Sequence, residues 1–212
     1  MGENPSYFSR NGEGKDLVKD ISDADLKRFP VEKVSWDQCQ LFIAKLNKQV
    51  SEPAWVYRLP KDVEWEYACR GGPMSDQRNS AFDFYLGKPT NTLLPEQANI
   101  DYATGMKDYG NGLKRTCKVG SYEPNVLGLY DMHGNVWEWC DDTEVSDGVS
   151  RHVNRGGSFF DDAWYSRAAH RPKDLPSIRD FHLGLRLARV PSGAGSTEAK
   201  ALPTDPELRA AE

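Results

Sequence analysis

Residues 128–139 read Gly-Leu-Tyr-Asp-Met-His-Gly-Asn-Val-Trp-Glu-Trp, and this stretch says more about the fold than any other. It predicts two short strands, over residues 128–133 and 135–140, on either side of Gly134. Trp137 and Trp139 lie two residues apart, so on a strand they point to the same face. We expect both indoles to pack in the core rather than against a ligand.

A helix is predicted over residues 35–50, well before this stretch. Ser35 and Gln38 have the spacing of a capping box, which satisfies two backbone donors at a helix start. Apolar side chains then recur at helical spacing on one face, at Cys39, Phe42, Ile43 and Leu46.

A second helix is predicted between Pro60 and the glycines at 71–72. Proline suits the first turn, and Asp62 and Glu64 suit its positive end. A left-handed glycine after the last turn would end it. From residue 71 to residue 115 no periodicity persists, so we expect mostly loop.

Further strands are predicted over residues 117–122, 152–160 and 183–190. In the last of these, apolar and polar residues alternate with a period of two. We therefore expect Leu183, Leu185 and Leu187 to point inward and Arg186 to point outward.

Composition limits the class of protein. The chain has 212 residues with 32 acidic and 27 basic side chains, a net charge of −5, which disfavours a nucleic-acid partner. No apolar stretch reaches the roughly 20 residues of a membrane span, and the N-terminus lacks a signal peptide. We expect no membrane association and, by default, a cytoplasmic location. The four cysteines form no CxxC pair, and we expect structural thiols.

The frequent glycine and proline, 18 and 13 residues, indicate an α+β domain with short elements and long irregular loops. We place this domain at residues 1–191. Residues 192–212 lack aromatic side chains and are rich in small and charged ones, so we expect a disordered tail or linker.

Four motifs in a fixed order carry a resemblance to a known family. They are Arg58-Leu59-Pro60 with Glu64-Trp65-Glu66-Tyr67-Ala68, the stretch 128–139, Arg155-Gly156-Gly157-Ser158, and Leu183-Gly184-Leu185-Arg186-Leu187-Ala188. Together they resemble the formylglycine-generating enzyme family, also called the sulfatase-modifying factor family. The resemblance implies a variant of the C-type lectin fold, with short twisted antiparallel strands and two helices. Family members usually have some tens of residues before the segment matched by Met1–Ser6. Two expectations follow: either the N-terminal edge is truncated, or another segment replaces the missing strand.

The resemblance also implies a test for catalysis. Family enzymes hold Cu(I) with two cysteines shortly after the Arg-Gly-Gly-Ser motif, because soft thiolates suit that ion. Here no cysteine follows Cys140. We therefore expect neither copper binding nor oxidase activity. The related sulfoxide synthases use a histidine-rich iron site, and the four histidines of this chain lack the H-x-x-x-H spacing of such a site.

Calcium is a possible cofactor by the same resemblance. Asn135 and Glu138 match family positions that give oxygens to Ca²⁺, which prefers six to eight hard oxygen ligands. Asn99 matches a second family site, whose later ligands would fall near residues 108–111. The alternative is that Asn135 caps a turn and that Glu138 pairs with an arginine such as Arg155.

The segment from Phe159 to His182 has the composition of a binding surface. It mixes aromatic and short polar side chains without periodicity. Phe159 and Phe160 are adjacent, so they cannot both enter one core. The candidate ligand-binding residues are Phe159, Phe160, Asp161, Asp162, Trp164, Tyr165, Ser166, His170, Ser177, Ile178, Arg179, Asp180, Phe181 and His182.

Some proteins of this fold resemble targets of diversity-generating retroelements, in which mutation at adenines rewrites the C-terminal surface. An AAC codon changed at its adenines cannot encode Met, Trp, Lys, Glu or Gln. Apart from Trp164, the candidate residues contain none of these five types. Ordinary divergence of an exposed surface explains the same pattern.

The sequence thus favours a non-catalytic domain that binds an unidentified protein or small ligand. In this hypothesis, retroelement mutation diversifies the binding surface of the domain. Two alternatives stay open. One is a formylglycine-generating-type oxidoreductase with altered chemistry. The other is a regulatory module fused to another domain such as a kinase.

Overall fold

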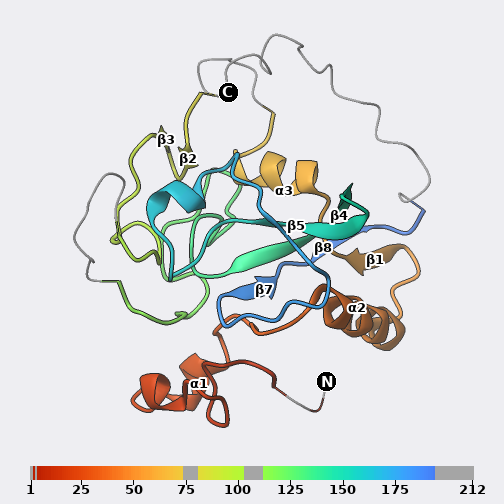
Figure 1. Cartoon of the computed structure of the whole chain (residues 1–212), viewed down its shortest axis with the longest axis horizontal. Coiled ribbons are helices and arrows are strands. Elements are labelled where there is room, and N and C mark those ends of the chain that lie inside the picture. Colours follow the sequence, from red (N-terminus) through yellow and green to blue (C-terminus); the bar gives the residue numbers. More distant parts are fainter. Residues whose placement is uncertain (1, 3, 74–80, 103–111, 194–212) are drawn as a thin grey trace.

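A four-stranded sheet with the order β6-β5-β4-β7 forms the centre of the structure (Figure 1), a computed structural model that describes residues 2, 4–73, 81–102 and 112–193. Its strands are β4 (Trp137–Ser146), β5 (Val149–Arg155), β6 (Lys173–Asp174) and β7 (Leu183–Leu185). Strands β4 and β5 form an antiparallel hairpin, and β6 pairs antiparallel with β5. Strand β7 pairs parallel with β4, so Trp137 lies opposite Leu183.

Two small antiparallel pairs and several short helices complete the architecture. The remaining elements are the 3-10 helices η1 (Lys15–Val18) and η2 (Ala163–Ser166), the helices α1 (Asp23–Leu26), α2 (Trp36–Val50) and α3 (Asp62–Cys69), and the strands β1 (Trp55–Arg58), β2 (Phe84–Tyr85), β3 (Pro89–Thr90) and β8 (Ala188–Pro191). Strand β1 pairs with β8, and β2 pairs with β3. No helix in the described part of the chain is long and apolar enough to cross a membrane.

The two longer helices cover opposite faces of the central hairpin (Figure 1). On one face, Cys39 and Ile43 of α2 pack with Trp139. On the other face, Trp65 and Cys69 of α3 pack with Cys140, the next residue of the same strand. Adjacent strand residues point to opposite faces, so β4 alone supplies both halves of the core. Trp137 and Trp139 are 7% and 0% exposed, which confirms the prediction that they are core residues.

Both predicted helices are present, with the predicted ends. The Ser35 hydroxyl accepts a hydrogen bond from the Gln38 amide, and the Gln38 side chain accepts one from the Ser35 amide, which is the full capping box. Helix α3 ends before Gly71, whose φ of 87° is a conformation that glycine adopts without strain.

The strands predicted at residues 117–122 and 128–133 are not formed. At residues 125–129 the Asn125 side chain bonds two amides of its own loop and two carbonyls at the end of α3. Its oxygen accepts from the amides of Leu127 and Leu129, and its nitrogen donates to the carbonyls of Ala68 and Cys69. A side chain that bonds nearby backbone competes with sheet formation, so this part of the chain is a loop.

The strand predicted at residues 183–190 divides into β7 and β8, which belong to different sheets. Arg186, between them, was predicted to point outward, away from the leucines. The alternation is present, because Leu185 and Leu187 pack against the core on the α2 side and Arg186 lies on the other face. Arg186 is nevertheless half-buried, because its guanidinium donates to both carboxylate oxygens of the buried Glu138, each at 2.8 Å. The strand predicted at 152–160 is β5, and it ends at Arg155.

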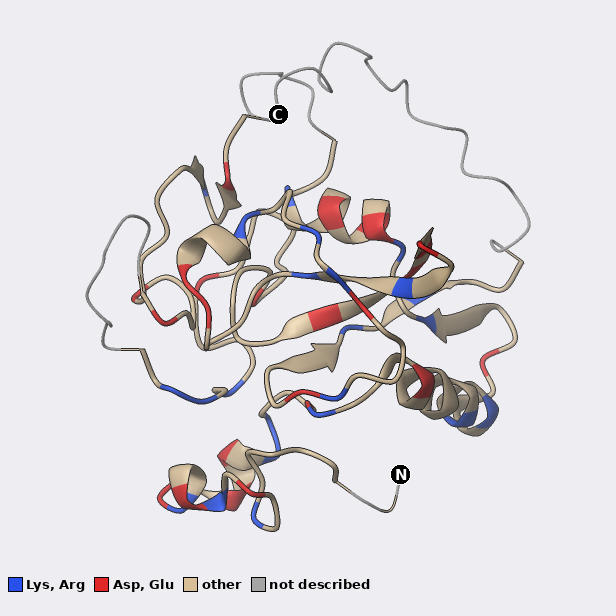
Figure 2. Ribbon diagram, in the orientation of Figure 1, with Lys and Arg blue, Asp and Glu red and all other residues tan. Residues whose placement is uncertain are grey.

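Arg155 is a buried cation, only 1% exposed, that joins α3 to the central sheet. Helix α3 carries several acidic residues (Figure 2), and two of them bond this guanidinium. Nε donates to Asp62 at 2.5 Å, and Nη2 donates to Glu66 at 2.6 Å. Nη1 donates to the carbonyl oxygens of Ala168 and His170, at 2.7 and 3.1 Å. A lysine could not reproduce this planar set of bonds.

We therefore predict that Arg155→Lys lowers the free energy of unfolding by about 3 kcal/mol, because one ammonium cannot reach both carboxylates and both carbonyls, and buried acceptors are left without a donor. Urea unfolding measures the loss. The matched control is Arg189→Lys in the exposed Arg189–Glu52 ion pair, where we expect less than about 1 kcal/mol. Equal small losses at both positions would contradict the account.

Candidate ligand-binding site

The segment that carries the site leaves the sheet through Gly156 and Gly157, which have φ of 99° and 73°. A Cβ on Gly157 would lie 2.1 Å from the Ser166 hydroxyl, so glycine lets this turn pass directly against η2. Arg155 then holds the carbonyls that follow η2, and Arg171 forms ion pairs with Asp62. Apart from the exposed Arg171, the bonds that fix the backbone of the segment come from buried groups.

Six of the fourteen candidate residues line one cavity of about 250 Å³, which we call the Asp161 pocket. They are Asp161, Tyr165, His170, Ile178, Asp180 and His182. Five further residues complete the lining: Trp137, Asn154, Pro172, Asp174 and Leu183. The pocket thus combines the η2 segment, the β7 strand and the inner strands β4 and β5.

Asp161 lies at the base of this pocket against Trp137. Its Oδ2 accepts the indole N–H of Trp137 at 2.8 Å and the hydroxyl of Ser158 at 2.5 Å. Burial raises the pKa of this carboxyl above its usual value. Trp137 therefore has two roles, since it packs in the core and also positions a carboxylate of the pocket.

His170 and Tyr165 contribute rings to the lining of the Asp161 pocket, and Trp164 lies beside them. The His170 ring lies 4.7 Å from the Trp164 ring and 5.4 Å from the Tyr165 ring, centroid to centroid, with edge-to-face geometry. The Arg167 guanidinium lies 4.2 Å from the centroid of the Trp164 ring. Burial, reinforced by Arg167 and Arg155, lowers the pKa of His170, which favours its neutral form.

The other candidate residues are divided between surface and core. Phe159 and Ser166 are 0% exposed, so the prediction that they belong to a binding surface is wrong. Phe159 enters a small aromatic core with Phe8, and Phe181 packs against it. Phe160 is 57% exposed, as expected for one member of the Phe159–Phe160 pair.

The remaining members lie outside the lining. Trp164 is exposed beside the pocket, and Asp162 caps η2 by accepting from the Trp164 amide at 2.8 Å. Ser177 and Arg179 are exposed on the following loop, where Arg179 donates to the carbonyl of Lys33.

Sequence reasoning missed Asn154, Pro172 and Asp174 and assigned Trp137 to the core alone. One signal was available for Asn154, which is a polar residue inside an otherwise buried strand end. Asp174 gave none, because only the pairing of β6 with β5 brings it to the pocket.

Glu138 and Asn135, the calcium candidates, have their oxygens occupied by protein donors. Besides Arg186, the Glu138 carboxylate accepts the indole N–H of Trp65 at 2.6 Å. Asn135 Oδ1 accepts from Asn99 Nδ2 and from the Cys117 amide, at 3.1 and 3.0 Å. This arrangement fits the ion-pair alternative, with Arg186 rather than Arg155 as partner, and does not fit a calcium ligand at Glu138.

Asn99 lies beside Asn135, in the interior. Residues 108–111, where the other ligands of that second site would fall, lie outside the described residues. Among the residues that are described, no three His, Cys, Asp or Glu side chains are grouped so that they could hold a metal ion. Asn99 Oδ1 is buried and accepts no hydrogen bond from the described residues, unlike the oxygens of Asn135 and Glu138. Calcium stays a prediction.

The four cysteines are buried and unpaired, and none of them lines the Asp161 pocket. Burial raises the pKa of Cys39 and of Cys117 to about 12. Such thiols are protonated at neutral pH, and thiolate is the form that binds soft metals.

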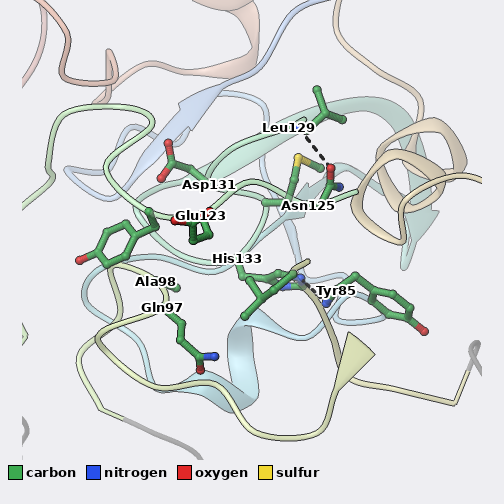
Figure 3. A pocket seen from close by; sticks show the side chains of 11 residues that line it. Tyr85, Gln97, Ala98, Glu123, Asn125, Leu129, Asp131 and His133 are labelled. Atoms are coloured by element: carbon green, nitrogen blue, oxygen red, sulfur yellow. Dashed lines mark hydrogen bonds between the residues drawn. The ribbon is translucent and has the colours of Figure 1, made fainter. Parts of the chain in front are cut away.

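A smaller hollow surrounds His133 (Figure 3) and is structural. The buried imidazole accepts from the Tyr85 amide at Nε2, at 2.9 Å, and Nδ1 faces the Ser166 carbonyl at 2.7 Å. Only a ring that carries its proton on Nδ1 satisfies both contacts. Burial lowers the pKa of His133 to about 4. The neutral ring therefore ties the end of η2 to β2.

With the geometry established, comparison with known proteins defines the class. Residues 6–191 match the sulfatase-modifying factor enzyme 1-like domain, and the chain belongs to this family. The fold is the C-type-lectin-like fold of its formylglycine-generating enzyme members. A similar structure is Treponema denticola variable protein 1, with a TM-score of 0.65 and 26% identity, over 90% of this chain and 78% of that one.

Curated relatives include catalytic and inactive members. The formylglycine-generating enzyme of Thermomonospora curvata is 32% identical over 194 residues, 79% of this chain and 57% of that protein. The inactive C-alpha-formylglycine-generating enzyme 2 of Bos taurus is 31% identical over 176 residues, 79% of this chain and 51% of that protein. The chain therefore spans about half the length of these relatives. Serine/threonine-protein kinase Pkn1 of Chlamydia trachomatis is 29% identical over 182 residues, 76% of this chain but 24% of the kinase.

We predict that millimolar Ca²⁺ or a chelator shifts the melting temperature by less than about 1 °C, because Arg186 already neutralises Glu138. A ligand that bound only the folded state would raise that temperature by mass action. Differential scanning calorimetry, with Mg²⁺ as the control ion, measures the shift. A melting temperature that rises with Ca²⁺ but not with Mg²⁺, and falls again with chelator, would show that calcium binds the folded protein.

A second prediction concerns pH. The unfolded His133 takes up a proton near pH 6.5, whereas the folded one does so near pH 4, so this residue removes stability as pH falls through that range. The wild type should therefore lose more unfolding free energy than His133→Gln when the pH falls from 7 to 4.5. We expect the difference in this loss to be up to about 3 kcal/mol. Urea unfolding at a series of pH values measures this difference. A difference independent of pH would show that His133 titrates normally.

Proposed function

We propose that this chain is a non-catalytic binding domain whose ligand occupies the Asp161 pocket. The observation that carries the proposal is the convergence of six residues, chosen for composition alone, on one cavity. That cavity combines exposed aromatic rings with short polar side chains, which is the composition of recognition surfaces.

The absence of paired thiols supports a role without copper chemistry. No cysteine follows Cys140 in the sequence, and all four thiols are buried. The family includes at least one relative named as inactive, so loss of catalysis has a precedent within it. A formylglycine-generating-type oxidoreductase with altered chemistry is the alternative.

The proposal includes a second, more specific element, that a retroelement diversifies the binding surface. Diversification is supported by the exposed candidates such as Phe160, Tyr165 and Ile178, which project from a backbone fixed by Arg155, Gly157 and Arg171. The similarity to Treponema denticola variable protein 1 adds to it. The buried Phe159 and Ser166 would tolerate few replacements. A reverse-transcriptase gene beside a near-repeat of the coding region for this segment would support it, and their absence would leave ordinary divergence.

The direct test is a selection of peptides from a random display library on the intact domain. We expect Tyr165→Ala and Ile178→Ala to weaken binding of the selected peptides at least tenfold, since both side chains are exposed in the pocket lining. Tyr67→Ala and Val145→Ala are matched controls, because both side chains are exposed elsewhere, on α3 and β4. Peptides that lose binding only to the control variants would contradict the proposal.

The oxidoreductase alternative requires a separate measurement. Competition with a colorimetric Cu(I) chelator should show no tight, stoichiometric site, and a cysteine-containing sulfatase peptide should remain unmodified in the presence of oxygen. Tight Cu(I) binding together with conversion of the peptide would establish the enzyme instead.

A further inference from the structure

The Asp161 pocket is strongly acidic. Its lining contains three carboxylates, those of Asp161, Asp174 and Asp180, and no lysine or arginine among the described residues. Nearby cations are engaged elsewhere: Lys173 pairs with Glu144, and Arg171 with Glu144 and Asp62. His182 lies 3.1 Å from Asp180, so the carboxylates that face the pocket without an ion-pair partner in its described lining are those of Asp161 and Asp174.

A second feature of the lining is a buried hydrogen-bond acceptor without a donor. Asn154 is 2% exposed, and its Nδ2 donates to Asp174 at 2.5 Å, which fixes the orientation of the amide. Its Oδ1 is buried and accepts no hydrogen bond from the described part of the protein. Leaving a buried acceptor unpaired costs about 1–3 kcal/mol, so the site is built for a donor that arrives from outside.

Asp161 offers a further acceptor. Both of its described hydrogen bonds fall on Oδ2, so Oδ1 has no donor within the described residues. Trp137 and Tyr165 supply aromatic surface to the same lining. Aromatic faces attract organic cations as well as apolar groups. Acceptors, negative charge and aromatic walls together select a ligand that is cationic and rich in N–H donors.

We propose that the Asp161 pocket binds a primary ammonium or guanidinium group on an aliphatic stem, such as a lysine or arginine side chain of a protein partner. This inference rests on the proposed function and names the chemistry of its ligand. A metal ion fits less well, because the described acidic side chains do not group closely enough to hold one. A cavity of about 250 Å³ suits one long side chain, being smaller than the roughly 300–1,000 Å³ pockets of drug-sized ligands.

The test is titration of the full chain with small probes at pH 7, followed by amide NMR shifts. The cationic probes are Nα-acetyl-lysinamide and Nα-acetyl-argininamide, and the neutral matches are Nα-acetyl-norleucinamide and Nα-acetyl-citrullinamide. Cadaverine, a free diamine, separates a side chain presented by a peptide from a free amine. We expect the cationic amides to bind at least tenfold more tightly than their neutral matches, and at least as tightly as cadaverine.

Charge-neutral variants assign the effect to the pocket. Asp161→Asn and Asp174→Asn should each weaken binding of the cationic probes at least tenfold. Asp174→Asn leaves the Trp137–Asp161 bond in place and keeps a side-chain oxygen that can accept from Asn154, and its melting temperature checks that it is folded. The control is Asp147→Asn in the exposed turn between β4 and β5, which should change nothing.

The outcomes separate this inference from the proposed function. Equal binding of cationic and neutral amides in the pocket would overturn the cation inference and leave the binding function standing. If cadaverine bound more tightly than both cationic amides, the ligand would be a free amine, and the inference of a lysine or arginine side chain would be overturned. No shifts with any probe would overturn the inference, while the peptide selection would still decide the binding function.

Discussion

The buried guanidinium of Arg155 is the interaction on which the rest of the structure depends. Arg155 stands at the end of β5 and joins this strand to two other parts of the chain. Its guanidinium donates to the carboxylates of Asp62 and Glu66 on α3, and to the carbonyls of Ala168 and His170. A charge buried in this way is tolerated only with all of its partners in place, so the three parts must fold together.

The backbone that carries the candidate site is held in place by Arg155 together with Gly157 and His133. Gly157 lets the chain turn against η2, His133 holds the Ser166 carbonyl, and Arg155 holds the two carbonyls beyond it. These bonds engage backbone atoms or buried side chains. The exposed side chains of the segment are left to face the pocket and the solvent, so the surface can change without changing the fold.

What the sequence predicted well was local or was carried by ordered motifs. The α2 helix begins where the Ser35–Gln38 capping box places it, and the family resemblance supplied the lectin-like fold. What failed depended on distant partners. Arg186 is half-buried because its partner Glu138, 48 residues away, is buried, and Asn125 holds residues 127–129 in a loop where a strand was predicted.

In the pocket, too, the sequence predicted the residues of one continuous segment and missed those brought in by distant strands. Composition identified Asp161, Tyr165 and His170, because a mixture of aromatic and short polar residues is visible in a linear sequence. It could not find Asn154 and Asp174, which reach the pocket only through the pairing of β5 with β6. Composition also could not separate the buried Phe159 from the exposed Phe160, since the direction of each side chain depends on the turn that precedes them.

The central claim is that a fixed frame carries a replaceable surface. The most direct measurement is the free energy of unfolding, in urea, of one variant in which Phe160, Tyr165, Ser177 and Ile178 are all changed to alanine. Exposed substitutions each change stability by about 0.5 kcal/mol or less, so the account predicts a total loss of at most about 2 kcal/mol. A loss of about 5 kcal/mol or more, as expected when core aromatics are truncated, would show that these side chains hold the fold and would contradict the account.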